Sequence, residues 1–131
     1  MAHTIVEYSD NLAGEGDIPG LLKKIAAKFC DAGGVFPIGG VRVRAYRASE
    51  YVIADGNDDY AFVHTVVKLG AGRSAEFKKN FFDELFEVIK AHFADLMQRR
   101  YLALSMYVEE VDETGSYKHN NIHRKFKKDP A

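Results

Sequence analysis

Hydrophobic and polar residues follow two different spacings along the chain, and each spacing predicts one kind of element. Residues 3–8 form a short β-rich run, and residues 41–47 alternate strictly between apolar and polar positions, as in a half-buried strand. Residues 60–69, which are rich in valine and aromatic residues, and residues 102–111 are also typical of strands. These four runs predict four β-strands.

Two segments between these runs have helical spacing. In the first, Asp17 and Pro19 are suited to the start of a helix, and Gly33 and Gly34 to its end. Between them, apolar residues recur at a period of 3.6, namely Ile18, Leu21, Leu22, Ile25 and Phe29. Ser74 is the expected cap of a second helix of about 25 residues with a broad apolar face.

The predicted order is therefore β-α-β, repeated once, in a single α/β domain over residues 1–131 with a C-terminal arm from about residue 112. Two such halves with right-handed crossovers place four strands in one sheet and both helices on one face. The other face is left uncovered. Because the strands are so apolar, we expect that face to pack against other subunits.

Composition excludes several classes of function. The net charge of −1 argues against a general binder of polyanions, so we expect no nucleic acid partner. The basic run 124–128 is interpreted as a solvated arm rather than a nucleic-acid patch. No apolar run approaches the roughly 20 residues that span a bilayer, and residues 1–4 lack a basic leader, so we expect a cytoplasmic protein without a membrane partner.

The cysteine and histidine content argues against a metal centre. Cys30 is the only cysteine, and its place in an amphipathic helix favours a small buried residue, with a nucleophile as the alternative. The five histidines, at positions 3, 64, 92, 119 and 123, do not form a credible ligand set. The acidic run 55–59 lacks the later glutamate of a calcium loop and is interpreted as a turn.

Arginines provide the candidate binding chemistry. Arg73 follows a glycine-rich turn and directly precedes the cap at Ser74, where free backbone amides and a cation favour anions. Arg42 and Arg44 share one face of a strand whose other face is apolar, and their planar guanidinium groups suit carboxylates. Solvent-exposed arginines are the alternative at both places. Two arginine sites together suggest a ligand with more than one carboxylate.

Short segments in a fixed order, covering nearly the whole chain, resemble a known family. They include Val35-Phe36-Pro37-Ile38-Gly39-Gly40-Val41-Arg42, Lys68-Leu69-Gly70-Ala71-Gly72-Arg73 and Asn120-Asn121-Ile122-His123. In this order they are similar to the 5-carboxymethyl-2-hydroxymuconate isomerase family of the tautomerase superfamily. Each segment is weak evidence alone, but their common order makes the resemblance specific.

This resemblance implies a homotrimer of two-halved subunits whose strands face the threefold interior, with neither metal nor organic cofactor. It implies a small-molecule polycarboxylate substrate from aromatic catabolism and a proton shift along its dienol, with an N-terminal proline as the base. Arg42 and Arg73 match the family's active-site arginines. Arg44 and Phe36 are further candidate substrate-binding residues.

The sequence departs from the family at the catalytic base, because Ala2 stands where the proline is expected. Removal of Met1 would expose a primary amine, whose reference pKa of about 7.7–8.0 would be lowered by burial and by Arg42 and Arg73. We therefore expect reduced but real activity with Ala2 exposed, and none with Met1 retained. A homologue that only binds anions, and an amine that forms imines with carbonyls, are the alternatives.

Overall fold

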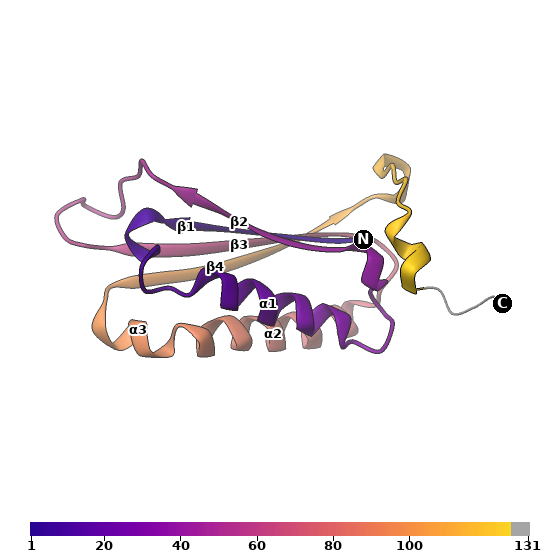
Figure 1. Cartoon of the computed structure of the whole chain (residues 1–131), viewed down its shortest axis with the longest axis horizontal. Coiled ribbons are helices and arrows are strands. Elements are labelled where there is room, and N and C mark those ends of the chain that lie inside the picture. The colour runs from indigo at the N-terminus through magenta and orange to yellow at the C-terminus, as the bar shows by residue number, and fades with distance from the viewer. Residues whose placement is uncertain (127–131) are drawn as a thin grey trace.

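A computed structural model describes residues 1–126 and contains one four-stranded sheet with its helices on one side (Figure 1). The strands lie in the order β2-β1-β3-β4. Each half contributes a parallel pair, β1 with β2 and β3 with β4, and the halves join where β1 and β3 run antiparallel. The predicted fold class is confirmed, with strands β1 (Ala2–Ser9), β2 (Val41–Ala48), β3 (Ala61–Gly70) and β4 (Leu102–Val111).

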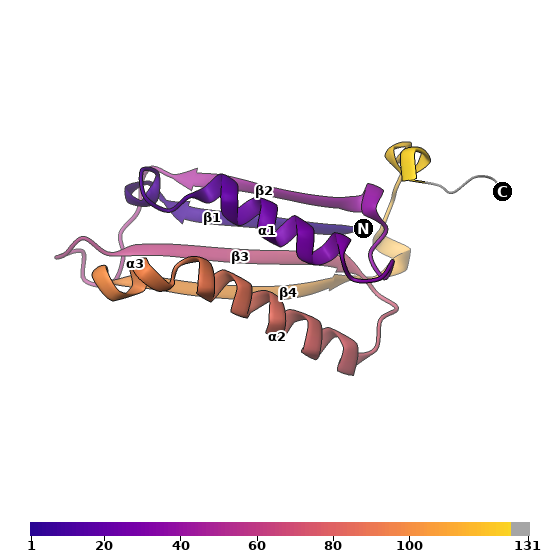
Figure 2. The ribbon, with the colours of Figure 1, turned by 60° about the horizontal axis from the view of Figure 1, so that its bottom comes forward.

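The two main helices begin at their predicted caps. The Asp17 carboxylate accepts a hydrogen bond from the Gly20 backbone N–H at 3.2 Å at the start of α1 (Ile18–Cys30). The Ser74 hydroxyl accepts one from the Phe77 backbone N–H at 3.0 Å at the start of α2 (Ala75–His92). Helix α1 lies over the β1–β2 half of the sheet and α2 over the β3–β4 half (Figure 2).

The single long helix predicted after Ser74 is divided in the structure. Helix α2 ends at His92, and a short helix α3 (Ala94–Arg99) follows. The break lies at Phe93, whose φ of −101° and ψ of 10° leave the helical path. Phe93 is completely buried, so its ring packs into the core at the point where the backbone turns.

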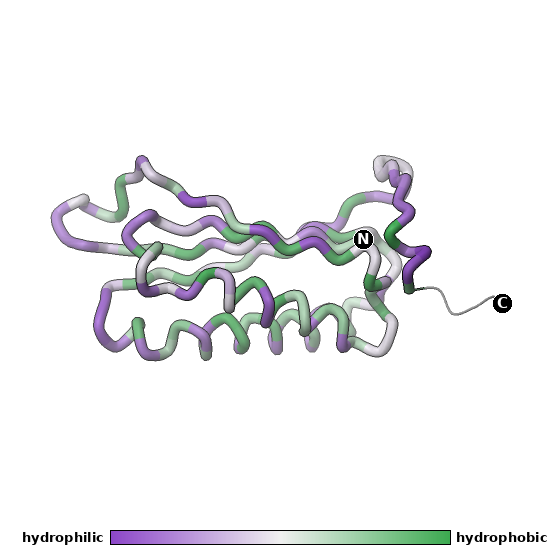
Figure 3. Tube along the Cα trace, in the orientation of Figure 1, coloured by the Kyte–Doolittle hydropathy of each residue, from purple (hydrophilic) through white to green (hydrophobic). Residues whose placement is uncertain are grey.

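The core lies between the sheet and the helices and is rich in phenylalanine. Phe29 and Phe36 meet edge to face with ring centroids 4.9 Å apart, and Phe81 lies at the same distance from Phe36. Hydrophobic and hydrophilic residues alternate along the strands (Figure 3), which sends successive side chains to opposite faces of the sheet. Val41 and Val43 pack toward the core, so Arg42 and Arg44 lie on the opposite face, as predicted.

The face opposite the helices, which we call the open face, is more polar than the apolar strand sequences suggested. Half-buried Ile5 and Val66 are cross-strand partners at its centre. Charged or titratable side chains surround them, at His3, Arg42, Arg44, Lys68 and Glu109. The period-two pattern accounts for the difference, because each strand directs its apolar set mainly to the helices.

Residues 112–126, the C-terminal arm, leave β4 and pack at the end of the sheet where the N-terminus lies (Figure 1). The short helical turn η4 (Ile122–Phe126) lies against η2 (Ile38–Gly40), and the Asn120 amide donates to the Gly39 carbonyl at 2.8 Å. Arg124 and Lys125 are exposed, as expected of a solvated arm, whereas Lys127 and Lys128 lie outside the described residues. Within residues 1–126, no helix is both long and apolar enough to cross a membrane.

Candidate active site at the N-terminus

The N-terminus is held at the start of a central strand. Ala2 is the first residue of β1 and is only 2% exposed. It is paired with Val41 on one side and with Leu69 on the other. The backbone that would carry the predicted catalytic amine is therefore fixed by both neighbouring strands.

The Met1 side chain occupies the space beside Arg42. Arg42 Nη1 lies 2.8 Å from Met1 Sδ and donates to it. A Cβ atom at position 40 would lie 3.0 Å from Met1 Cγ, so Gly40 leaves room for this side chain. Met1 thus occupies one guanidinium donor of Arg42. Its removal would free that donor and transfer the amine to Ala2.

Positive charges from three parts of the chain surround the N-terminal amine. The pKa of the Met1 amine lies below its ordinary value of 8.0, chiefly because the group is buried, and then because Lys118, Arg73 and Arg42 are close. The structure therefore brings Arg42 and Arg73 to the N-terminus. An amine on Ala2 would experience the same two causes, since both burial and nearby cations disfavour the charged form.

Arg44 is connected to this site through His3. Arg44 Nη1 lies 3.2 Å from His3 Nδ1, and Arg42 Nη1 lies 3.4 Å from His3 Nε2. Burial lowers the pKa of His3, and the charges of Arg42 and Arg44 lower it further. A neutral imidazole thus lies between two guanidinium groups. Arg42, His3 and Arg44 therefore lie side by side on the open face, and His3 lies between Arg44 and the N-terminal site.

Arg73 is positioned by an aromatic ring and by two carbonyl groups. Its Cζ lies 4.5 Å from the centroid of the Phe36 ring, and its Nη1 and Nη2 donate to the Gly70 and Val35 carbonyls at 3.0 and 3.2 Å. Its buried Nε has no partner among residues 1–126. Phe36 itself is only 1% exposed. Phe36 therefore supports Arg73 directly, while its contact with substrate remains a prediction.

A cavity of about 260 Å³ lies beside Met1, between the end of β3 and the C-terminal arm. Lys68 and Lys118 contribute its charged groups, and no acidic residue lines it. Sequence reasoning missed both lysines. Lys68 opens one of the family-like segments and Lys118 stands just before another, but only the folded arm shows that they lie near the N-terminus.

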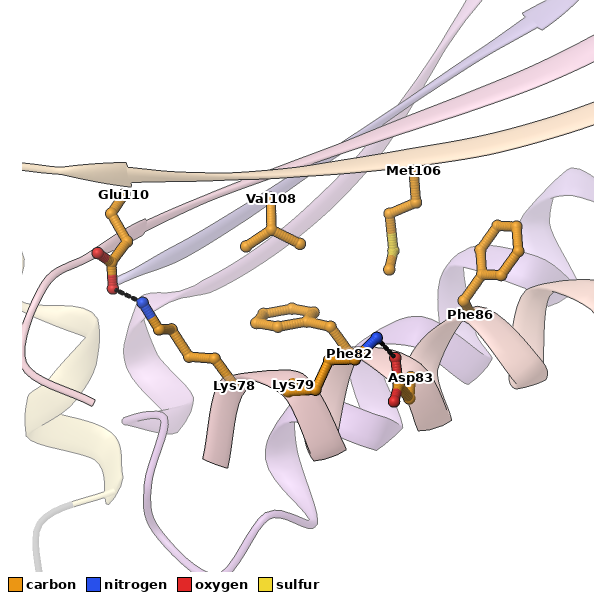
Figure 4. Close-up of a pocket in the computed structure, with 8 residues that line it drawn as sticks. All are labelled: Lys78, Lys79, Phe82, Asp83, Phe86, Met106, Val108 and Glu110. Atoms are coloured by element: carbon orange, nitrogen blue, oxygen red, sulfur yellow. Dashed lines mark hydrogen bonds and ion pairs between the residues drawn. The ribbon is translucent and has the colours of Figure 1, made fainter. Parts of the chain in front are cut away.

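A larger groove, of about 540 Å³, lies between α2 and β4, but its lysines are accompanied by acidic residues. Phe82 and Phe86 of α2 face Met106 and Val108 of β4 across it (Figure 4). The four charged residues that line it form two ion pairs, Lys78–Glu110 and Lys79–Asp83. This groove has no unpaired charge to offer an anionic ligand.

The described part of the chain, residues 1–126, contains no group of three or more histidine, cysteine, aspartate or glutamate side chains that could hold a metal ion. His123 instead packs against Gly39, close enough that a Cβ atom there would lie 2.7 Å from the His123 backbone nitrogen. Cys30 is half-buried in α1.

Comparison with known proteins finds a matching family and a close relative. Residues 2–126 match the family model of 5-carboxymethyl-2-hydroxymuconate isomerase. A 5-carboxymethyl-2-hydroxymuconate Delta-isomerase from Escherichia coli is 47% identical over 127 residues, which is 97% of this chain and 100% of the relative.

Solved structures show the same similarity. A crystal structure of a 5-carboxymethyl-2-hydroxymuconate isomerase from Deinococcus radiodurans R1 superposes with a TM-score of 0.92 at 45% identity, covering 97% of this chain and 95% of that one. A fused 4-OT symmetric trimer shares the fold alone, with a TM-score of 0.65 at 14% identity over 89% of this chain and 93% of that one. The chain belongs to the 5-carboxymethyl-2-hydroxymuconate isomerase family.

Proposed function

We propose that the protein is a cofactor-independent isomerase that moves a proton along the dienol of 5-carboxymethyl-2-hydroxymuconate, the activity for which its E. coli relative is named. The observation that carries the proposal is the environment of the N-terminus, where burial and the charges of Lys118, Arg73 and Arg42 lower the pKa of the Met1 amine and would act in the same way on an Ala2 amine. An amine with a lowered pKa beside several cations provides both groups that the reaction needs, a base and a binding site for carboxylates.

In the proposed reaction Arg42 and Arg73 bind carboxylates and hold the dienol beside the amine. Arginine suits this task because its planar group offers two parallel donors to a carboxylate. The neutral amine removes a proton from the dienol, the π electrons shift along the conjugated chain, and the resulting ammonium returns a proton to a carbon atom. The amine is regenerated and the product has the composition of the substrate, so no cofactor is consumed.

Removal of Met1 is a condition of this proposal. With Met1 in place, its sulfur accepts from Arg42 at 2.8 Å and the amine stands one residue too far out. One residue corresponds to up to about 3.8 Å between Cα atoms, whereas proton transfer requires heavy atoms within about 2.6–3.2 Å. Methionine is normally removed before a small residue such as Ala2.

The decisive experiment compares one chain before and after its amine is exposed. A precursor with a cleavable N-terminal extension is cut so that Ala2 becomes the first residue, and mass spectrometry verifies that residue. Isomerisation is then followed by ultraviolet absorbance. We expect no rate above buffer before cleavage and clear turnover afterwards, below that of Ala2→Pro. An inert cleaved protein with a native circular dichroism spectrum would refute the proposal.

The same sample separates the alternatives. A protein that binds a dicarboxylate in a thermal-shift assay without turnover would be a binding homologue. Trapping of a keto acid by borohydride would indicate an imine-forming amine. Neither result is expected as the main activity, because a proton shift needs only the acid-base chemistry of the amine.

We also propose that three copies assemble through the open face. Its half-buried Ile5 and Val66, which are cross-strand partners, support an interface there.

A further inference from the structure

We propose that the cavity of about 260 Å³ beside Met1 is a carboxylate subsite, in which Lys118 and Lys68 bind the carboxymethyl carboxylate that distinguishes this tricarboxylate from 2-hydroxymuconate-type dicarboxylates. This inference rests on the proposed substrate. It makes the C-terminal arm, to which the sequence alone assigned no role in binding, a determinant of specificity.

The shape of the cavity suits one end of a ligand. With Met1 in place its volume is below the roughly 300–1,000 Å³ of a complete small-molecule site. Loss of the Met1 side chain would extend the cavity toward the Ala2 amine, so it accommodates one end of a substrate whose remainder lies at that amine. One wall comes from the end of β3, at Lys68, Leu69 and Gly70, and the other from residues 115–118 of the arm. Met1, His3 and Val111 complete the lining, and through Met1 and His3 the cavity adjoins the N-terminal site.

The charges in the cavity are of one sign. Lys68 and Lys118 line it, and neither forms an ion pair within 4.0 Å in the part of the chain that the structure describes. Lys118 lies close enough to the terminus to be the strongest of the charges that lower the pKa of the amine, ahead of Arg73 and Arg42. Two ammonium groups without an ion-pair partner among the described residues, beside the N-terminal amine, fit an anion and disfavour a cation.

The number of cationic groups also matches the substrate. Arg42 and Arg73 account for two carboxylates, and neither lines this cavity. A third carboxylate therefore needs another partner. Lys68 and Lys118 line the cavity beside Met1, whereas Arg44 is turned toward His3. Lysine binds an anion as a mobile point charge, which suits a flexible carboxymethyl group.

The arm holds Lys118 in place through contacts with the segment before β2. The Asn120 amide donates to the Gly39 carbonyl at 2.8 Å, and its oxygen accepts from the Ile122 backbone N–H at 2.7 Å. These bonds anchor the arm two residues beyond Lys118. Lys118 is therefore presented from an anchored segment, although its side chain is exposed and free to adjust to a ligand.

The test compares Lys118→Gln and Lys68→Gln with Lys23→Gln, which removes the same charge from an exposed position on α1 outside every cavity described above. The cleaved enzyme is assayed with the tricarboxylate and with 2-hydroxymuconate at a pH where the amine is neutral. We expect KM for the tricarboxylate to rise about tenfold in each cavity variant, as when one charged hydrogen bond is lost. KM for 2-hydroxymuconate and kcat for both substrates should stay within about twofold.

A binding experiment keeps this inference separate from the proposed function. Propane-1,2,3-tricarboxylate and a matched dicarboxylate are titrated calorimetrically, with inorganic phosphate as a control for unspecific anion binding. Wild type and Lys23→Gln should prefer the tricarboxylate about tenfold, and Lys118→Gln should lose that preference even if no turnover is ever seen. Equal loss of affinity for all three anions, or an unchanged preference, would overturn the subsite whether or not the isomerase activity is found.

Discussion

At the scale of single residues, the site is dominated by positive charge that the fold leaves uncompensated. Arg42, Arg44, Arg73, Lys68 and Lys118 gather near the N-terminus, and none of them forms an ion pair within 4.0 Å with residues 1–126. The positive charges in such a cluster repel one another, and an anionic substrate relieves this repulsion when it binds. It also concentrates substrate near the amine, an effect that salt weakens.

The lowered pKa of the amine predicts the pH dependence of the activity. The amine acts as a base only when neutral, so kcat/KM should rise with pH and level off above the amine pKa. Burial and nearby cations lower the pKa of the Met1 amine from 8.0 and would act in the same way on the Ala2 amine, so the inflection should lie below 8. In Lys118→Gln the inflection should move upward, since one of these charges is lost. An inflection above 8, or a profile unchanged in Lys118→Gln, would contradict this assignment.

Arg73 provides a second residue-scale prediction. Its guanidinium stacks on Phe36 and donates to two carbonyls, so its orientation is fixed before substrate binds. In Arg73→Lys the charge is kept but the planar fork is lost, and we expect KM to rise roughly tenfold or more. Arg47→Lys is the matched control, because Arg47 is exposed and pairs with Asp10 away from the site. Steady-state kinetics with equal KM values for the two variants would argue against a binding role for Arg73.

At the scale of elements, the arm and the η2 turn depend on one small residue. A Cβ atom at position 39 would lie 2.7 Å from the backbone nitrogen of His123 and 2.8 Å from its Cα, a contact that only a backbone shift can relieve. Gly39 thus allows η4 to approach η2. The position of Lys118 depends on this contact, because Lys118 and His123 belong to the same short arm.

Substitution Gly39→Ala should therefore displace the arm while leaving the sheet intact. Hydrogen exchange should become faster in residues 112–126 and stay unchanged in β1 and β3, and KM for the tricarboxylate should rise as in Lys118→Gln. Gly14→Ala is the control, because a Cβ atom there would meet nothing within 4 Å and Gly14 lies outside the cavity and the arm. Unchanged exchange in the arm of Gly39→Ala would show that this close approach does not hold it.

Elements that follow from local pattern were predicted well, and contacts between distant segments were not. The strand 102–111 and the caps at Asp17 and Ser74 depend on neighbouring residues and are confirmed. The break at Phe93 was missed because apolar spacing continues through it. Lys118 was missed because its role depends on Asn120 reaching Gly39, a contact between residues 81 positions apart that periodicity cannot reveal.

At the scale of the whole molecule, the sheet has one face covered by helices and one face open. Ile5 and Val66 pair at the centre of the open face, and each is only half-buried within one chain. Around them lie groups that are costly to bury unless they find partners, such as Arg44 and His3. An assembly that covers this face would bury its apolar centre. The polar groups would then either form hydrogen bonds across the interface or line a water-filled interior.

The open face should therefore control the oligomeric state. Analytical ultracentrifugation of the wild type should give about three times the 14.7 kDa of one chain. Val66→Asp should give monomers with an unchanged far-ultraviolet circular dichroism spectrum, because a carboxylate there would be buried in the interface yet points away from the core of its own subunit. Val52→Asp is the control, since Val52 is 83% exposed in the loop before β3. A trimeric Val66→Asp would place the interface elsewhere, and a monomeric wild type would show that the open face faces solvent.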